Sequence, residues 1–232
     1  MGASNPGGST LSPAGTTRRR RTPDVARAEI LDAAEQRLAS EGPEGIRLKG
    51  IAGDVGLSHS TLLHHFGSRQ GLVEALAERT MRGLARDLVE AIRARDPVAS
   101  APATLQQVFR TLGDGGHARL LIWRVLTGWT QPGHSLEGTL LRQLIDALHE
   151  RRATLHRERG APAPSRSETA FTSLLATFAI IGEAAVGSLV LDGHGAGMSQ
   201  AEFRSHLVEL VLERLVGDTP GGREALVREG AI

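Results

Sequence analysis

Four polar residues, Ser60, Thr61, His64 and His65, lie within one short helical segment and have the types and spacing needed to contact DNA. At about 100° per residue they sweep the side of the helix opposite Leu62, which belongs to an apolar face. Short hydroxyl side chains permit close approach of the helix, and hydroxyl and imidazole groups hydrogen-bond to base edges. The pattern therefore predicts that this face enters the major groove of double-stranded DNA.

A metal site is the competing interpretation of His64 and His65. Adjacent histidines on a helix point in different directions, and the nearest acidic residues, Asp54 and Glu74, are not at chelating spacing. We therefore favour a groove contact over a metal ligand, and we expect neither a metal nor a cofactor.

The segment that must position these residues has the pattern of a helix-turn-helix. A short helix ends at Gly56, and Ser58 is a natural N-cap for the helix that follows. An ordinary helical hairpin inside a core has the same pattern, so geometry alone leaves that alternative open. The apolar face of the first of these helices consists of Leu48, Ile51, Ala52 and Val55.

The rest of the chain also follows helical periodicity, and no segment alternates as the strands of a hairpin do. Pro23 begins the first helix, Gly42 and Pro43 end it, and a Pro/Ala/Ser break is expected over residues 96–102. The predicted fold is all-α, with an N-terminal three-helix helix-turn-helix domain and a C-terminal helical domain. Later helices are expected over residues 104–112, 117–129, 136–159, 167–191 and 201–216.

Composition and charge narrow the function further. The 232 residues carry a formal net charge of +1, so any nucleic-acid surface must come from the local arrangement of cations. The absence of cysteine excludes a disulfide scaffold, an Fe–S cluster and a thiol nucleophile. With no tyrosine and only 3% aromatic residues, binding of single strands by base stacking is disfavoured.

The ends of the chain are expected to lie outside the folded domains. Residues 1–21 have the composition of a disordered basic tail, and its four consecutive arginines, Arg18–Arg21, suit an arm along phosphates or in a minor groove. We expect the helix-turn-helix domain that binds DNA over residues 22–70, a second helical domain over residues 71–217, and a C-terminal tail over residues 218–232.

One segment, Thr172–Leu191, is long enough and apolar enough to be considered as a membrane span. Glu183 at its centre and its many small residues favour a buried or dimer-interface helix, because an acid in the middle of a bilayer is costly. We expect a cytoplasmic protein with no membrane partner.

A set of short motifs within residues 27–76 resembles the TetR family of bacterial transcriptional regulators in order and spacing. The motifs are Ile30-Leu31-Asp32-Ala33-Ala34, Glu41-Gly42, Ile51-Ala52, Gly56-Leu57-Ser58, Thr61-Leu62, His64-His65-Phe66, Ser68-Arg69 and Leu72. Beyond this region the chain resembles the family only in being helical and of the expected length.

The resemblance implies a homodimeric repressor that presents its third helix to each half of a palindromic operator and is released by a small-molecule ligand. It also assigns ligand binding and dimerisation to the helical domain over residues 71–217. Lys49 and Arg69 would hold phosphates. Leu63 departs from the usual Tyr, so that contact is either lost or replaced by apolar packing, as on a thymine methyl group. Arg47 departs from the usual Ser or Thr, so it would supply a phosphate contact but no helix cap. The implied set of DNA-binding residues is Arg47, Lys49, Ser58, His59, Ser60, Thr61, Leu63, His64, His65 and Arg69.

The later helices are expected to hold a ligand. An ionisable group in an apolar helix needs a partner, and Glu183 could pair with His117 or Arg124, face the ligand, or cross a dimer interface. With so few aromatic residues, a cavity would be lined mainly by Leu, Ile, Val and Ala and would suit an apolar or amphipathic molecule. The candidate ligand-binding residues are Phe109, His117, Trp123, Arg124, Trp129, Phe178 and Glu183.

The last two long helices are the candidates for a dimer interface, and their stripes would serve equally for packing inside one monomer. Small residues in the first of them permit close helix approach: Ala176, Ala179, Gly182, Ala184, Ala185 and Gly187. The apolar stripe of the second consists of Phe203, Leu207, Leu210, Val211 and Leu215.

Enzyme motifs such as Gly-x-Ser-x-Gly, His-Glu-x-x-His and a Walker loop are missing from the sequence, so we expect no enzyme. The main alternative to a DNA-binding regulator is a helical homodimer that binds a small molecule and whose helix-turn-helix no longer reads DNA. Leu63 and the near-neutral net charge favour that alternative. An all-α enzyme is a third hypothesis, supported only by the presence of His and Glu residues.

Overall fold

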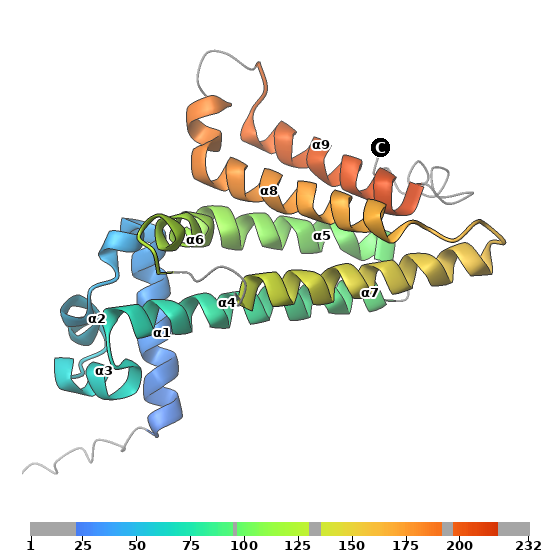
Figure 1. Ribbon diagram of the computed structural model, residues 1–232. Coiled ribbons are helices and arrows are strands. Elements are labelled where there is room, and N and C mark those ends of the chain that lie inside the picture. Colours follow the sequence, from blue (N-terminus) through green and yellow to red (C-terminus); the bar gives the residue numbers. More distant parts are fainter. Residues whose placement is uncertain (1–21, 95–96, 130–135, 192–196, 218–232) are drawn as a thin grey trace, which may run out of the picture.

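The computed structural model describes residues 22–94, 97–129, 136–191 and 197–217, which form helices and connecting turns with no strand (Figure 1). The expected all-α fold is confirmed for this part of the chain. The two expected tails, residues 1–21 with Arg18–Arg21 and residues 218–232, lie outside the described residues.

Three helices and a 3₁₀ turn build the N-terminal unit: α1 (Pro23–Glu41), η1 (Pro43–Gly45), α2 (Leu48–Asp54) and α3 (His59–Phe66). Thr22 and Ser58 cap α1 and α3 through their side-chain oxygens, whereas Arg47 at the start of α2 makes no such cap, as the sequence predicts. Gly56 lies in the left-handed region at φ +64° and supplies the turn between α2 and α3.

The core of this unit is closed by a helix from the rest of the chain. Fully buried side chains of α1, α2 and α3, such as Ile30, Ile51 and Leu62, pack together with the start of the fourth helix. Leu120 of α6, which is 1% exposed, belongs to the same cluster, and Trp123 of α6 packs against its edge. The three-helix unit therefore depends on α6 to complete its apolar core.

The remaining helices form the larger unit. They are α4 (Arg69–Arg93), α5 (Pro97–Phe109), α6 (His117–Leu126), α7 (Leu136–Glu158), α8 (Arg166–Val190) and α9 (Gln200–Leu212), with π-helical turns η2 (Arg110–Asp114) and η3 (Glu213–Gly217). In Figure 1, α4 and α7 lie side by side, α8 and α9 form the opposite layer, and α5 lies between them. The expected boundary at residues 70 and 71 falls inside α4, so this helix belongs to both units.

The expected break over residues 96–102 is wrong. Helix α5 begins at Pro97 and continues through Pro102 to Phe109. Pro97 stands where a helix tolerates proline, because the first N–H groups have no intrahelical partner, and Pro102 removes one backbone hydrogen bond without ending the helix.

A polar network joins α1, α4 and α6 where the two units meet. Arg79 of α4 donates to Asp32 and Glu35 of α1, and the Nε2 atom of the buried His117 lies 3.5 Å from Glu35 Oε1. The hydrogen bond from His117, supported by the charge of Arg79, lowers the pKa of the Glu35 carboxyl below its ordinary value of 4.5, although burial opposes the shift. The folded state thus favours the ionised form of Glu35.

We predict that Glu35→Gln lowers the free energy of unfolding at neutral pH by up to about 1 kcal/mol, since a partly exposed ion pair contributes no more. A carboxyl whose pKa is lowered on folding stabilises the protein above its unfolded value of 4.5, and that stability is lost as the pH falls through the folded value. The difference in the free energy of unfolding between Glu35→Gln and the wild type, measured by urea unfolding, should therefore disappear as the pH falls below 4.5. Glu90→Gln, at an exposed position of α4, is the control. A difference that does not depend on pH would contradict this role of Glu35.

Candidate nucleic-acid interface and ligand cavity

The expected DNA-reading residues lie at one end of the molecule, on the two short helices α2 and α3 (Figure 1). Ser60 and His64 of α3 are exposed, Thr61 and His65 are half-buried, and His59 is exposed at the start of the helix. Leu63 is 37% exposed on the same surface. The structure therefore brings the α3 residues together on one accessible face, as the helical spacing predicts.

Hydroxyl groups at the start of α3 form a compact cluster around Ser58. Ser58 Oγ accepts a hydrogen bond from the backbone N–H of Thr61 at 3.1 Å and lies 2.8 Å from both Ser60 Oγ and Thr61 Oγ1. This arrangement assigns Ser58 to capping and positions the other two hydroxyls beside it.

The other end of α3 is held by Arg27 of α1, which sequence reasoning did not single out. Its guanidinium donates to the carbonyl oxygen of His65 at 3.0 Å and lies 4.5 Å from the centre of the Phe66 ring. A cation at the C-terminus of a helix is favourable, and contact with a ring face adds to it. No sequence pattern marked Arg27, because its partners are 38 residues away.

Close backbone contact fixes the junction between α3 and α4. A Cβ atom at Gly71 would lie 2.1 Å from the carbonyl oxygen of Phe66, so only glycine permits this approach.

Arg37 of α1 makes a two-pronged ion pair with Asp54 at the end of α2. The hydrogen bond and the charge of Arg37 lower the pKa of the Asp54 carboxyl. Both ends of the α2–α3 pair are thus attached to the helices behind it.

Two of the three expected phosphate contacts remain on the surface. Lys49 is exposed on α2 and is the one lysine in the 232-residue sequence. Arg47 is also exposed, although its Nε donates to the carbonyl oxygen of Glu44 at 3.0 Å.

Arg69, the third expected phosphate contact, has a different set of partners. Its Nε donates to the carbonyl oxygen of Ile46 at 2.7 Å, and a second nitrogen donates to that of Pro43 at 2.8 Å and lies 3.5 Å from Glu44. The guanidinium also lies 4.9 Å from the centre of the Trp123 ring. These contacts direct the Arg69 guanidinium toward the protein, so the structure favours a structural role for Arg69 over the expected phosphate contact.

Trp123 and Trp129, both expected to line a ligand cavity, belong to the same group of contacts. Their rings meet edge to face at 4.7 Å, and Trp123 Nε1 donates to Glu44 Oε1 at 3.0 Å. We call Arg69, Glu44, Trp123 and Trp129 the arginine–tryptophan clamp, because they join η1, α4 and the α6 segment.

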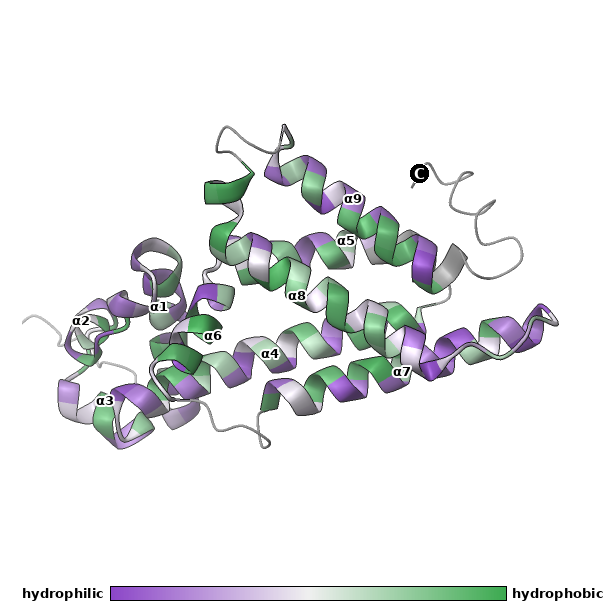
Figure 2. Cartoon of the chain, turned by 45° about the horizontal axis from the view of Figure 1, so that its top comes forward, coloured by the Kyte–Doolittle hydropathy of each residue, from purple (hydrophilic) through white to green (hydrophobic). Residues whose placement is uncertain are grey.

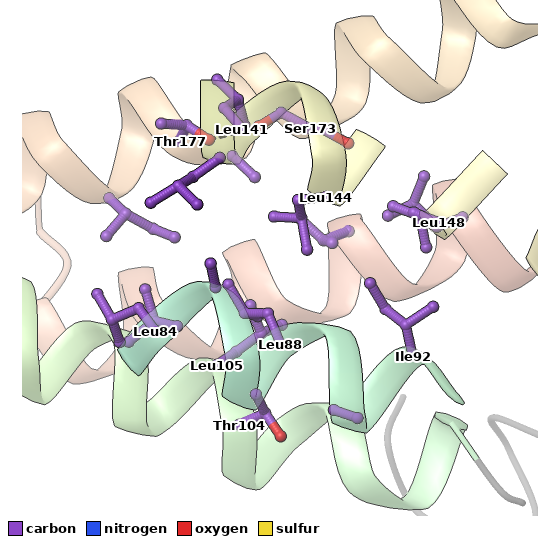
Figure 3. Close-up of a pocket in the computed structure, with 18 of the residues that line it drawn as sticks. Leu84, Leu88, Ile92, Thr104, Leu105, Leu141, Leu144, Leu148, Ser173 and Thr177 are labelled. Atoms are coloured by element: carbon purple, nitrogen blue, oxygen red, sulfur yellow. Dashed lines mark hydrogen bonds between the residues drawn. The ribbon is translucent and has the colours of Figure 1, made fainter. Parts of the chain in front are cut away.

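A cavity of about 360 Å³ lies between α4, α5, α7, α8 and α9, with Leu121 of α6 also in its lining, and well away from α3. Figure 3 shows Leu84 and Leu88 of α4 pointing toward Leu141 and Leu144 of α7 across it. Its lining is mostly Leu with Ile, Val and Ala, which confirms the expected character of a cavity. The volume falls within the range of pockets that hold small molecules.

Among the described residues that line this cavity, none is one of the seven side chains expected to bind a ligand. His117 is buried in the α1–α4–α6 network, Arg124 pairs with Glu137 at 2.6 Å, and Phe178 is 68% exposed on α8. The expectation rested on rings and charges in apolar helices, whereas this cavity is lined by aliphatic residues whose convergence only the fold determines.

Glu183 pairs with Arg204 of α9, and neither expected partner is involved. The two side chains meet at 2.8 Å, and the Arg204 guanidinium lies 5.3 Å from the centre of the buried Phe109 ring. Glu183 is 6% exposed, and this pair holds α8 against α9.

An apolar stripe runs along the outer face of α8, visible as the green residues on this helix in Figure 2. The helix is long and apolar enough to be considered as a membrane span, which on its own is weak grounds for one. The expected α9 stripe instead packs mainly inside the chain. Leu207, Val211 and Leu215, with Phe203 against them, join an apolar cluster of the larger unit that includes Leu84, Phe109 and Ile180, and within the stripe only Leu210 is exposed. The exposed residues of the α8 stripe are Phe171, Leu174, Leu175, Phe178, Val186, Leu189 and Val190.

Comparison with known proteins identifies the N-terminal segment. Residues 30–76 match the family described as bacterial regulatory proteins, tetR family. An uncharacterised HTH-type transcriptional regulator of Mycobacterium tuberculosis is 36% identical over 93 residues, which is 40% of this chain and 45% of that protein. The HTH-type transcriptional regulator BetI of Burkholderia mallei is 33% identical over 122 residues, which is 51% of this chain and 60% of that protein.

The chain thus spans about half the length of the curated relatives that it matches. A solved structure described as the molecular basis for control of antibiotic production by bacterial hormones superposes with a TM-score of 0.60 and 22% identity. The superposition covers 82% of this chain and 97% of that one, and at this identity the likeness concerns the fold.

We predict that Arg69→Ala lowers the free energy of unfolding by about 2 kcal/mol, because two backbone carbonyls lose a charged donor. Arg69→Lys should recover little of this, since an ammonium group cannot reproduce the planar fork or the stacking. Both tryptophans of the chain lie in the clamp, so removal of the Arg69 guanidinium should also shift their intrinsic fluorescence. Unchanged stability with weaker binding to all DNA sequences would instead restore Arg69 as a phosphate contact, and Arg82→Ala on α4 is the control.

Proposed function

We propose that this chain, whose residues 30–76 belong to the TetR family of bacterial regulatory proteins, is a transcriptional regulator that binds double-stranded DNA as a homodimer. We further propose that it is a repressor, released from a palindromic operator by a small molecule, and that it acts in the cytoplasm. The relatives described above are named as regulators, and an enzymatic activity forms no part of this proposal.

The observation that carries the proposal is the accessible face of α3. The helix projects from the end of the molecule, is capped at its start by Ser58, and is attached at its end by Arg27. Its outer side chains are short or able to hydrogen-bond, which is what entry into a major groove requires. A helix fixed at both ends presents these groups in one orientation and so supports recognition of a defined sequence.

We assign different tasks to the exposed residues of α2 and α3. Lys49 and Arg47 contact phosphates and set the affinity, because phosphate contacts carry no sequence information. Leu63 packs against a thymine methyl group, and this apolar contact replaces the one made by the tyrosine that TetR-family proteins usually have at this position. The base edges are read by Ser60, Thr61, His64 and His65.

The apolar stripe of α8 supports the homodimer. A row of large apolar side chains facing solvent along a whole helix is unusual for a monomer and is typical of an interaction surface. A second copy presents the same stripe, so a two-fold pairing of α8 with its mate covers both at once. A groove of about 420 Å³ between α8 and α9, bordered by Phe171 and Leu210, would receive side chains of the partner.

Release by a ligand would follow from the position of α6, which belongs to the larger unit and also completes the core of the N-terminal unit. A ligand that binds one arrangement of the cavity better than another shifts the population of the dimer toward it. Because α6 completes the N-terminal core and contacts Arg69 through Trp123, a displacement of α6 would alter the position of α3. The two reading helices of the dimer would then no longer match successive major grooves.

Selection from randomised double-stranded DNA tests the proposal against its main alternative, a ligand-binding dimer that no longer reads DNA. An enriched palindrome with half-sites about 34–36 Å apart is the expected result for a dimeric operator-binding protein. A folded dimer that enriches no sequence would overturn DNA recognition and leave the alternative.

We predict that Lys49→Ala weakens binding to the selected operator and to unrelated DNA alike, and lowers the slope of log K against log salt by about one. Arg86→Ala, which removes an exposed cation on α4, should change neither quantity. As the one lysine, Lys49 also allows a direct measurement: operator DNA should protect it from acetylation by an amine-reactive reagent. Equal labelling with and without saturating DNA would remove Lys49 from the interface.

We predict that Phe178→Glu converts the dimer into monomers at micromolar concentration, because the substitution places a charge in the middle of the α8 stripe. Leu126→Glu is the matched control, since Leu126 is 81% exposed but lies on α6. Sedimentation velocity measures the oligomeric state of both variants. If Phe178→Glu remained a dimer, the interface would lie elsewhere.

A further inference from the structure

The cavity described above is elongated and aliphatic. Its α7 wall extends from Glu137 to Leu155, which corresponds to about 27 Å along the helix, and its α4 wall extends from Met81 to Ile92. Among the described residues of the lining there is no aromatic ring. Such a surface offers no face for stacking a flat ring and instead fits a long saturated chain.

Most polar side chains of the lining already have partners within the protein. Ser173 and Thr177 each donate to the carbonyl oxygen of the residue four positions earlier, both at 2.8 Å. Glu137 at one end pairs with Arg124, and Arg152 at the other end donates to Thr169 Oγ1 at 2.6 Å and to the carbonyl oxygen of Leu215 at 3.1 Å. These groups therefore position the walls and leave little hydrogen-bonding capacity for a ligand.

Arg151 differs from these residues. It lines the cavity, and its Nε atom is buried without a hydrogen-bond partner among the described residues. Arg151 as a whole is half-buried, but its buried Nε–H has no acceptor among the described residues, and an unsatisfied donor of a charged group is costly. A carboxylate is the group that best satisfies a guanidinium. Arg152 adds a second positive charge at the same end, whereas the acidic Glu137 lies about 21 Å away along α7.

We propose that this cavity binds an aliphatic carboxylate, whose headgroup is held by Arg151 and whose chain lies between α4 and α7. The chain of the ligand would run from Arg151 past Leu148 and Leu144 toward Leu84, and Figure 3 shows these three leucines along the cavity. The inference rests on the proposed ligand role of the cavity and names the chemical class of the molecule that fills it.

Titration calorimetry of the full chain with three ligands of equal chain length tests the proposal: dodecanoate, dodecanol and dodecylamine, each below its micelle concentration. We expect dodecanoate to bind saturably and about tenfold or more tightly than dodecanol, and we expect no binding of dodecylamine. Equal affinity for dodecanoate and dodecanol in the wild-type protein would overturn the proposal without any variant.

Arg151→Met tests the anchor itself, because methionine keeps an apolar side chain in the lining and removes the charge. Its affinity for dodecanoate should fall about tenfold, to that of dodecanol, while its affinity for dodecanol stays at the wild-type value. Arg142→Met on the exposed side of α7 is the matched control and should bind as the wild type does. Undiminished binding of dodecanoate by Arg151→Met would reject Arg151 as the anchor.

The same variants separate this inference from the proposed function. Without ligand, Arg151→Met should bind the selected operator as tightly as the wild type, since the residue lies far from α3. Operator binding with no response to dodecanoate in the wild type would leave a DNA-binding protein with a different ligand. Loss of all operator binding in the wild type would instead concern the proposed function.

Discussion

The packing of α6 into the core of the three N-terminal helices is the constraint on which the rest of the structure depends. The fully buried side chains of α1, α2 and α3, such as Ile30, Ile51 and Leu62, pack in one cluster with Leu120, which comes from α6. The DNA-reading surface is consequently part of a larger packing arrangement, because a helix of one unit completes the core of the other. Polar contacts around Glu35 and the arginine–tryptophan clamp border this apolar contact on either side and fix its orientation.

Much of the fold follows from local pattern. Helix ends were predictable wherever a cap or a glycine turn acts within a few residues, as Ser58 and Gly56 do. Pro102 misled the prediction because tertiary packing can retain a helix that has lost one hydrogen bond, and no local rule reports that packing.

The candidate sites divide in the same way. The face of α3 was predictable because its residues are neighbours along one helix and share a period of 3.6 residues. The inward role of Arg69 was not, since its acceptors lie 23 and 26 residues earlier in the chain and its aromatic partner lies on α6. The cavity combines residues of six α-helices, so its residues could be assigned only a general aliphatic character in advance.

The exposed stripe of α8 has a consequence for the amount of protein that a cell must hold. If two chains are needed to cover it, the active species forms in proportion to the square of the free-chain concentration while most chains are single. A cell that contains little of the protein would then hold almost no dimer, and a modest rise in synthesis would produce a steep rise in the concentration of dimer. Chains that have not yet met a partner would meanwhile expose Phe178 and Leu189, which invites proteolysis and removes the surplus.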